Sequence, residues 1–489
     1  MSDPADLTAR EARRLIGRRA LSPVELADAC IARVEAIDPA VNAVVARDFD
    51  RLRAEARRAE AAVAEGRRLG PLHGLPVAVK DMNDVAGLPT TYGSEIFADT
   101  VAAADDALVA ALRGAGALIL GKTNVPEWSA GANTRNRVYG VTANPYDTTC
   151  SCAGSSGGSA VALATGMAPL ATGSDLGGSL RNPAAFCGVT GFRPSPGVVP
   201  DPGREMALLP LSTAGPMART PEDAALLLSV LSRRDGRDAW AHPAGALPPD
   251  LPEVDLAGLR VAATEDFGFA LVERTVRTAF RAALDRLSGA LGPRVAGCPD
   301  CAGADRIFAV LRAVGFLGRH RALLARHPDK VGPNVRANIA EGEGYSAADV
   351  AEALARQADY ARAWAGFFEE VDILLCPAVA ISPRPWSELY PAEIDGVPTG
   401  SYYHWLAMAY ATTIAGHPSV SIPCGRDGQG LPFGLQIVGR RHADLQVLAV
   451  ARDVAAAIAA DDALRLPPPD LDALRAAPPL SAAEGFRDL

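Results

Sequence analysis

Between residues 150 and 197 the chain is dominated by small residues, and this stretch restricts the fold more than any other. It contains Gly154-Ser-Ser-Gly-Gly-Ser159 and, after a helical stretch at 160–166, Gly173-Ser-Asp-Leu-Gly-Gly-Ser179. Because glycine has no Cβ, such loops let the backbone approach other groups closely. We therefore expect two serine-bearing loops against which another part of the chain packs closely.

The segments around these loops predict an α/β sheet. Residues 75–79 and 117–120 are short, apolar runs that predict buried strands, and residues 105–115 between them have helical spacing. A strand, a helix and a strand in this order predict parallel pairing. Further strands are expected at 259–263, 373–376, 420–423 and 433–438, and further helices at 220–231, 273–291, 304–327, 346–370 and 443–460.

The domain organisation follows from these segments. From residue 7 to about residue 64 the apolar spacing is helical, with helix starts expected at Ser22-Pro23 and Asp38-Pro39 because proline is favoured in a first turn. We expect residues 1–66 to be a helical lead-in packed on the core and residues 67–465 to be one α/β domain. Within that domain, 239–253 is expected to be a linker and 250–370 a helical cap over the pocket, while 466–489 is expected to be a proline-rich tail.

Composition excludes several function classes. The net charge of −9 and the pI near 5.4 argue against a nucleic-acid partner or an anionic membrane surface. Eight irregularly spaced cysteines do not form a disulfide framework, and no run of about 18 uncharged apolar residues occurs. We expect a cytoplasmic enzyme, monomeric or homo-oligomeric, that is not bound to a membrane.

Three lysines stand among the 48 basic residues, and one of them is a candidate base. Lys80 ends the strand at 75–79, where burial would disfavour its charged form and lower its pKa. A neutral amine can accept a proton directly or through a hydroxyl, for which Ser155 and Ser156 are both candidates. The seven histidines are scattered, and none lies in a recognisable triad motif.

Ser179 is the candidate nucleophile. A serine that follows two glycines can expose its hydroxyl while neighbouring backbone amides converge on one point. The amides of Leu176, Gly177, Gly178 and Ser179 would then hold the oxyanion that forms when a carbonyl group is attacked.

These motifs resemble the amidase signature family. The resemblance rests on Val77-Ala-Val-Lys80-Asp81, the two glycine-serine loops, Pro183-Ala-Ala-Phe-Cys-Gly188 and Gly434-Leu-Gln-Ile-Val-Gly439. It implies a large mixed, largely parallel sheet covered by helices on both faces. It further implies Ser179 as the acyl-accepting serine, Ser155 as a bridging serine with a cis peptide bond, and Lys80 as the base.

The resemblance also implies the reaction. Ser179 would form an acyl-enzyme with a small-molecule amide, aryl amide, carbamate or ester, using the Ser155 and Lys80 relay and neither a metal nor a cofactor. Asp175 and Arg181 would support the loop that carries Ser179. Trp128, Ser129, Tyr402 and Trp405 are expected to line the substrate pocket, which favours an apolar or aromatic substrate.

Two alternatives are also consistent with the sequence. Residues 154–158 also satisfy G-x-S-x-G, so an α/β-hydrolase esterase with Ser156 as nucleophile and a later histidine such as His417 must be considered. Residues 146–153 are not strand-like, however, as that motif requires. The second alternative is the glutaminase component of a glutamyl-tRNA amidotransferase, its A-type subunit, which belongs to the same family and acts on glutamine within a heteromeric complex.

Overall fold

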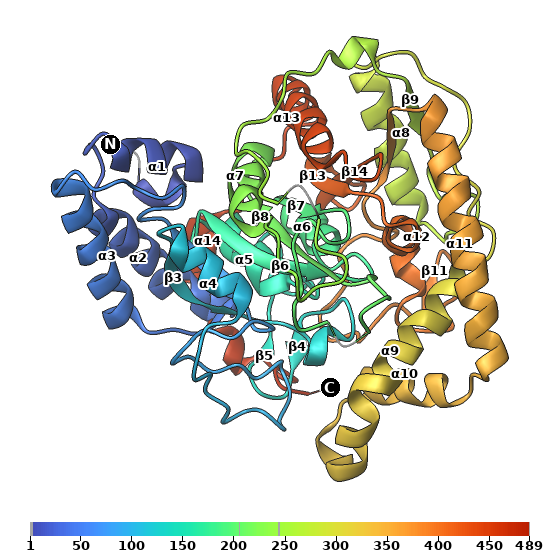
Figure 1. Cartoon of the computed structure of the whole chain (residues 1–489), viewed down its shortest axis with the longest axis horizontal. Helices are drawn as coiled ribbons and strands as arrows, with labels where there is room; N and C mark the ends of the chain where they lie inside the picture. The colour runs from blue at the N-terminus through green and yellow to red at the C-terminus, as the bar shows by residue number, and fades with distance from the viewer. Residues whose placement is uncertain (1–2, 205, 243–244, 489) are drawn as a thin grey trace.

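The computed structural model describes residues 3–204, 206–242 and 245–488, and a ten-stranded mixed sheet runs through this part of the chain (Figure 1). The strand order is β1-β3-β2-β6-β8-β7-β13-β14-β10-β9. The strands are β1 Val44–Ala46, β2 Pro76–Lys80, β3 Leu118–Thr123, β6 Leu170–Asp175, β7 Thr190–Arg193, β8 Thr213–Ala218, β9 Val261–Ala263, β10 Ile373–Pro377, β13 Ser419–Arg426 and β14 Pro432–Gly439. Two short ribbons pair β4 Arg135–Asn136 with β5 Gly140–Val141, and β11 Glu393–Ile394 with β12 Val397–Pro398.

Helices surround the sheet, with α1 to α3 at one end of the molecule and α8 to α11 at the other (Figure 1). Their bounds are α1 Ala9–Gly17, α2 Pro23–Val41, α3 Phe49–Ala64, α4 Ala107–Gly114, α5 Gly157–Ala164, α6 Arg181–Cys187, α7 Pro221–Leu231, α8 Arg274–Leu287, α9 Ala304–Arg326, α10 Pro333–Glu343, α11 Ala347–Glu370, α12 Ala407–Ala415, α13 Asp444–Ala460 and α14 Leu471–Ala476. No helix of the described ranges is long and apolar enough to cross a membrane.

The expected parallel unit is confirmed. Strands β2 and β3 pair in parallel across α4, with Lys80 opposite Thr123 and Val79 opposite Lys122. The sheet is mixed, as expected, but within the described residues its antiparallel pairings outnumber the parallel ones by six to three. One of these pairs follows from a short connection, since the link at 427–431 between β13 and β14 returns the chain antiparallel, whereas the other antiparallel pairs join strands that lie further apart in the sequence.

The helical lead-in differs from the expectation at Asp38-Pro39. No helix starts there, because α2 continues to Val41 with Pro39 in its last turn. The Asp38 carboxylate instead accepts hydrogen bonds from the amides of Ala43 (2.6 Å) and Val44 (3.1 Å), which turns the chain out of the helix. The following residues form β1, an antiparallel edge strand on β3, so this segment belongs to the sheet as well as to the helical layer.

The block between residues 250 and 370 holds one helix beyond those expected, α10, which packs against α9. Helix α11 packs against both α9 and α12, so these helices form one assembly beside the sheet (Figure 1). Residues 243 and 244 of the predicted linker lie outside the described part of the chain. The domain boundaries themselves, including those of the tail, stay predictions.

Candidate active site

Lys80 lies at the carboxyl end of β2, next to the end of the parallel strand β6. Its side chain is 0% exposed, and Nζ donates to Ser155 Oγ at 2.7 Å and to Ser174 Oγ at 2.9 Å. Burial lowers the pKa of Lys80 to about 7, although the charge of Asp175 acts to raise it. Near neutral pH this amine is therefore available as a base, in contact with two hydroxyl groups.

Ser155 follows a cis peptide bond with Gly154, as the family resemblance implies. Close backbone packing holds its loop. A Cβ on Gly158 would lie 2.4 Å from the Asn124 amide nitrogen, so only glycine fits there. The amide of Ser156 donates to the Ser179 carbonyl oxygen at 3.2 Å, which joins the two serine-bearing loops.

Ser179 is partly exposed and borders a cavity that Ser155 and Ser174 also line. Among the described residues none accepts a hydrogen bond from the amides of Leu176, Gly177 or Ser179. The Gly178 amide differs from the expectation, because it donates to Asp175 Oδ1 at 2.9 Å. We therefore remove Gly178 from the oxyanion donors and keep the other three amides.

The Asp175 carboxylate stabilises the Ser179 loop. It accepts hydrogen bonds from Arg181 Nε (3.0 Å) and Nη2 (2.9 Å), and also from the backbone amides of Gly178 and Leu180. Arg193, which the sequence reasoning missed, donates to the Asp175 carbonyl and carboxylate. Burial raises the pKa of Asp175, but the charges of Arg181 and Arg193 outweigh burial and hold the pKa well below its usual range.

Ser174 was not predicted as a site residue. It stands within the second glycine-serine motif, but the pattern does not indicate that its hydroxyl contacts Lys80. The contact arises because Ser174 belongs to β6, the parallel neighbour of β2, so the two side chains meet at the same edge of the sheet.

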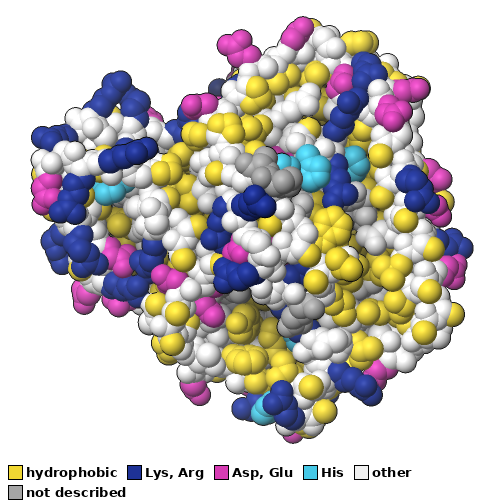
Figure 2. All heavy atoms as spheres, in the orientation of Figure 1, with side chains coloured by type: hydrophobic (Ala, Val, Ile, Leu, Met, Phe, Trp, Pro, Cys, Tyr) yellow, Lys and Arg dark blue, Asp and Glu magenta, His cyan; other side chains and the backbone are white. Residues whose placement is uncertain are grey.

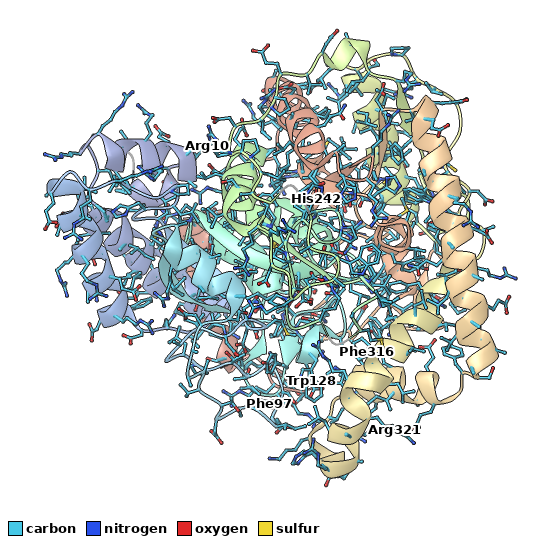
Figure 3. All side chains as sticks on the ribbon, in the orientation of Figure 1. Arg10, Phe97, Trp128, His242, Phe316 and Arg321 are labelled. Atoms are coloured by element: carbon cyan, nitrogen blue, oxygen red, sulfur yellow. The ribbon has the colours of Figure 1, made fainter. Side chains whose placement is uncertain are left out.

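The cavity beside Ser179 has a volume of about 210 Å³. Trp128, Ser129 and Tyr402 line it, together with residues of α9 that the sequence did not single out. These α9 residues are Phe308, Leu311, Arg312, Gly315, Phe316, Arg319 and His320. Figure 3 shows Trp128 close to Phe316 of α9, with Phe97 beyond it.

Trp405 lies elsewhere, contrary to the expectation. Its ring stacks on Phe186 at a centroid distance of 6.1 Å and borders a separate cavity of about 20 Å³. Trp405 lies in the middle of the 3-10 turn His404–Leu406 before α12, and the chain turns there so that Tyr402 lines the active cavity while Trp405 packs into the core. We therefore do not include Trp405 in the site.

Trp128 has a strained backbone at this cavity. Its φ and ψ are 45° and 30°, and Ser129 has a φ of 59°, so two consecutive residues with a Cβ adopt the left-handed region. The Trp128 ring stacks on His320 at 4.5 Å and meets Phe97 edge to face at 6.3 Å. A second cavity of about 450 Å³ shares Trp128 and His320, so this stack lies between the two spaces.

On the face shown in Figure 2, apolar side chains gather over the part of the molecule that α9 to α12 occupy in Figure 1, with arginines around it. Phe308 and Leu406 of this region contribute to the cavity wall. Apolar side chains therefore form much of the wall of this space, which Asp201, Arg204, Arg312 and Arg319 also line.

Comparison with known proteins agrees with these features. The family model described as Amidase matches residues 25–448. An acylamidase of Rhodococcus erythropolis is 33% identical over 452 residues, which cover 91% of this chain and 94% of the relative. The protein belongs to the amidase signature family.

Other members of the family are similarly related. The A-type subunit of the glutamyl-tRNA(Gln) amidotransferase of Salinispora arenicola is 33% identical, covering 94% of this chain and 98% of its own. The crystal structure of a bacterial aryl acylamidase superposes with a TM-score of 0.84 at 29% identity, covering 92% of this chain and 96% of that one. This amidase signature protein is therefore a hydrolase of carbon–nitrogen bonds other than peptide bonds.

The alternative of an α/β-hydrolase with Ser156 as nucleophile is wrong. The fold is that of the amidase signature family, and Ser156 lies at the start of α5 with 0% exposure. His417 is also unsuited to serve it, since Nδ1 is hydrogen-bonded to the Gly439 carbonyl oxygen and the ring stacks on Phe368.

Proposed function

We propose that this amidase cleaves small-molecule amides through an acyl-enzyme on Ser179, with Ser155 and Lys80 as the proton relay. The observation that carries the proposal is the buried Lys80 amine, which lies 2.7 Å from Ser155 Oγ and has a pKa lowered to about 7. A base whose pKa lies near the working pH is suited to move a proton in both directions.

In the first step, Ser179 Oγ attacks the carbonyl carbon while its proton passes to Ser155 Oγ. Ser155 at the same time gives its own proton to neutral Lys80 Nζ. The amides of Leu176, Gly177 and Ser179 hold the oxyanion. When the carbon–nitrogen bond breaks, the proton returns from Lys80 through Ser155 to the leaving nitrogen, which departs as an amine.

In the second step, water takes the place of the amine. The relay accepts a proton from the attacking water, the second tetrahedral intermediate collapses, and Ser179 recovers its proton as the acid leaves. Asp175 and Arg181 act through the loop, because their pairing holds the three amides in place.

Aryl amides are the substrates that we propose first. Support comes from the apolar and aromatic cavity wall, which includes Trp128, Phe308 and Phe316, and from the similarity to an aryl acylamidase and an acylamidase. Aryl carbamates and esters undergo the same acyl transfer and are the next candidates.

The test is a panel of anilides, primary amides, aryl carbamates and p-nitrophenyl esters, assayed with the wild type and with Ser179→Ala, Ser155→Ala and Ser156→Ala. Loss of a nucleophile or its relay costs up to about 10⁶-fold in kcat. Ser156→Ala is the matched control. Ser156 is next to Ser155 in the chain, but its hydroxyl contacts only the backbone amide and carbonyl groups of Ser174. An active Ser179→Ala enzyme would overturn the proposal.

The amidotransferase component is the alternative within the family, and relatives of that kind match at similar identity. The apolar and aromatic side chains in the wall, such as Trp128, Phe308 and Phe316, favour an aryl substrate over glutamine. Release of ammonia from glutamine by the purified chain, without activity on any anilide, would support the alternative.

A further inference from the structure

A buried polar cluster borders the apolar cavity on the side of α9. We name it the Arg312 cluster, and it consists of Arg312, Asn338, Glu341, Tyr402 and Tyr403. The Arg312 side chain is 3% exposed, donates to Glu341 Oε2 at 2.6 Å and to the Tyr402 hydroxyl oxygen at 3.0 Å, and lies 3.8 Å from the Tyr403 ring centroid. Arg312 and Tyr402 themselves line the cavity that Ser179 borders.

The charge of Arg312 is already balanced within the cluster. Glu341 accepts from Arg312 and, through its other oxygen, from the hydroxyls of Tyr345 and Tyr403, both at 2.8 Å. Because the guanidinium is paired with a carboxylate, the cluster offers a ligand no uncompensated positive charge. The Arg312 cluster is therefore not expected to select a carboxylate on the substrate.

The Tyr402 hydroxyl can still donate one hydrogen bond. Its oxygen accepts from Arg312 and from Asn338 Nδ2, the latter at 2.9 Å, which uses both lone pairs. Its own proton has no acceptor among the described residues, and the nearby Asn338 Oδ1 is buried and likewise unpaired. A phenol that accepts from a guanidinium is polarised and is a good donor.

We propose that the Tyr402 hydroxyl donates a hydrogen bond to a neutral acceptor on the substrate, so that the preferred substrates are small amides with a ketone, ether or similar oxygen away from the scissile bond. The inference rests on the proposed function of the Ser179 cavity and specifies its substrate class. Phe308, Leu311 and Leu406 add apolar wall to the cavity that Tyr402 and Arg312 line, so one neutral polar group in an apolar substrate would be recognised there.

The experiment compares isosteric pairs of amides that differ only in an acceptor oxygen. Levulinoyl anilide is compared with isocaproyl anilide, and the acetanilide with a para-acetyl group is compared with the one carrying a para-isopropyl group. For at least one pair, the ratio of kcat/KM for the ketone to kcat/KM for its hydrocarbon analogue is expected to be about tenfold higher in the wild type than in Tyr402→Phe. This factor corresponds to one neutral hydrogen bond.

Tyr403→Phe is the matched control. It removes a hydroxyl from the same cluster, but this hydroxyl donates to Glu341, and Tyr403 does not border the cavity among the described residues. The preference should stay at the wild-type value in this variant. An equal shift in both variants, or no shift in Tyr402→Phe for either pair, would overturn the proposal.

Two further measurements separate the inference from the proposed function. Succinyl anilide tests an anionic group, and a wild-type preference for it over levulinoyl anilide would overturn the choice of a neutral acceptor. Calorimetric binding of the preferred ketone to Ser179→Ala and to Ser179→Ala with Tyr402→Phe tests recognition without turnover. We expect about tenfold weaker binding in the double variant, and equal binding would contradict the role of Tyr402 even if Ser179→Ala is inactive.

Discussion

Two lysines at the ends of neighbouring parallel strands have opposite surroundings. Lys80 and Lys122 are both 0% exposed, but Lys122 pairs with Val79 in register, so the two side chains project from opposite faces of the sheet. Lys122 Nζ donates to Asp81 Oδ1 at 2.8 Å, to Thr90 Oγ1 at 3.0 Å and to the Pro89 carbonyl oxygen. Lys80 faces two serine hydroxyls.

The difference shows what makes a buried lysine a base. Lys122 Nζ contacts a carboxylate, whereas the carboxylate whose charge acts on Lys80 is Asp175, and two arginines already bind that carboxylate. Burial therefore favours the neutral form of Lys80. One lysine stabilises the fold, and the other is available to move protons.

Replacing each lysine with methionine should separate these roles, and the largest effect is expected at Lys80. Lys80→Met removes the proposed base, so kcat should fall about 10²- to 10⁴-fold while the fold persists. The decisive measurement is the anilide assay combined with chemical unfolding. An active variant, or one that loses activity only because it unfolds, would remove the distinction between the two lysines.

Lys122→Met should act mainly on stability. It leaves the buried Asp81 carboxylate without its cation, which costs about 3–5 kcal/mol in the free energy of unfolding. Adding Asp81→Asn should recover part of that loss, because the uncompensated charge is then absent. Urea unfolding of the single and double variants checks this, and a Lys122→Met protein of wild-type stability would contradict it.

The pH dependence tests the charge of Lys80 directly. Since only the neutral amine is a base and its pKa is about 7, kcat/KM should fall about tenfold per pH unit below pH 7 and level off above it. The free energy of unfolding should also rise with increasing pH. Between about 7 and the ordinary pKa of 10.5, the unfolded chain binds a proton that the folded chain does not, so the free energy of unfolding rises by about 1.4 kcal/mol per pH unit.

Lys80→Met provides the control for this slope. The variant lacks the group, so its unfolding free energy, measured from pH 7 to pH 10, should lack this rise. Identical slopes in the wild type and the variant would mean that Lys80 is protonated in the folded protein.

The smallest expected effect is at Ser174. Ser174→Ala removes one of the two hydroxyls in contact with Lys80 and should lower kcat/KM about five- to tenfold, the value of one hydrogen bond. Ser174→Thr keeps a hydroxyl and should retain most of the activity. If both variants match the wild type, the Ser155 contact alone suffices to orient the amine.

Much of the core was predictable because it depends on local pattern. The parallel β2 and β3 unit, helix α7 and the final helix α13 follow from apolar spacing and from proline or acidic residues at helix starts. The edge strand β1 was not predicted, since only three residues, Val44–Ala46, pair with β3 and they follow a long helix. The pattern of so short a strand is too weak to identify it.

By itself the sequence determined the chemistry: a chain with three lysines retains one at a strand end, beside glycine-rich serine loops that match a specific family. Tertiary structure alone decided which side chains meet. Ser174 contacts Lys80 from β6 and Arg193 contacts Asp175 from β7, Arg312 reaches the site from a helix far along the chain from Ser179, and Trp405 turns away from it. The reason is physical, because motif spacing specifies local backbone, whereas the environment that lowers the pKa of Lys80 arises only when distant segments pack together.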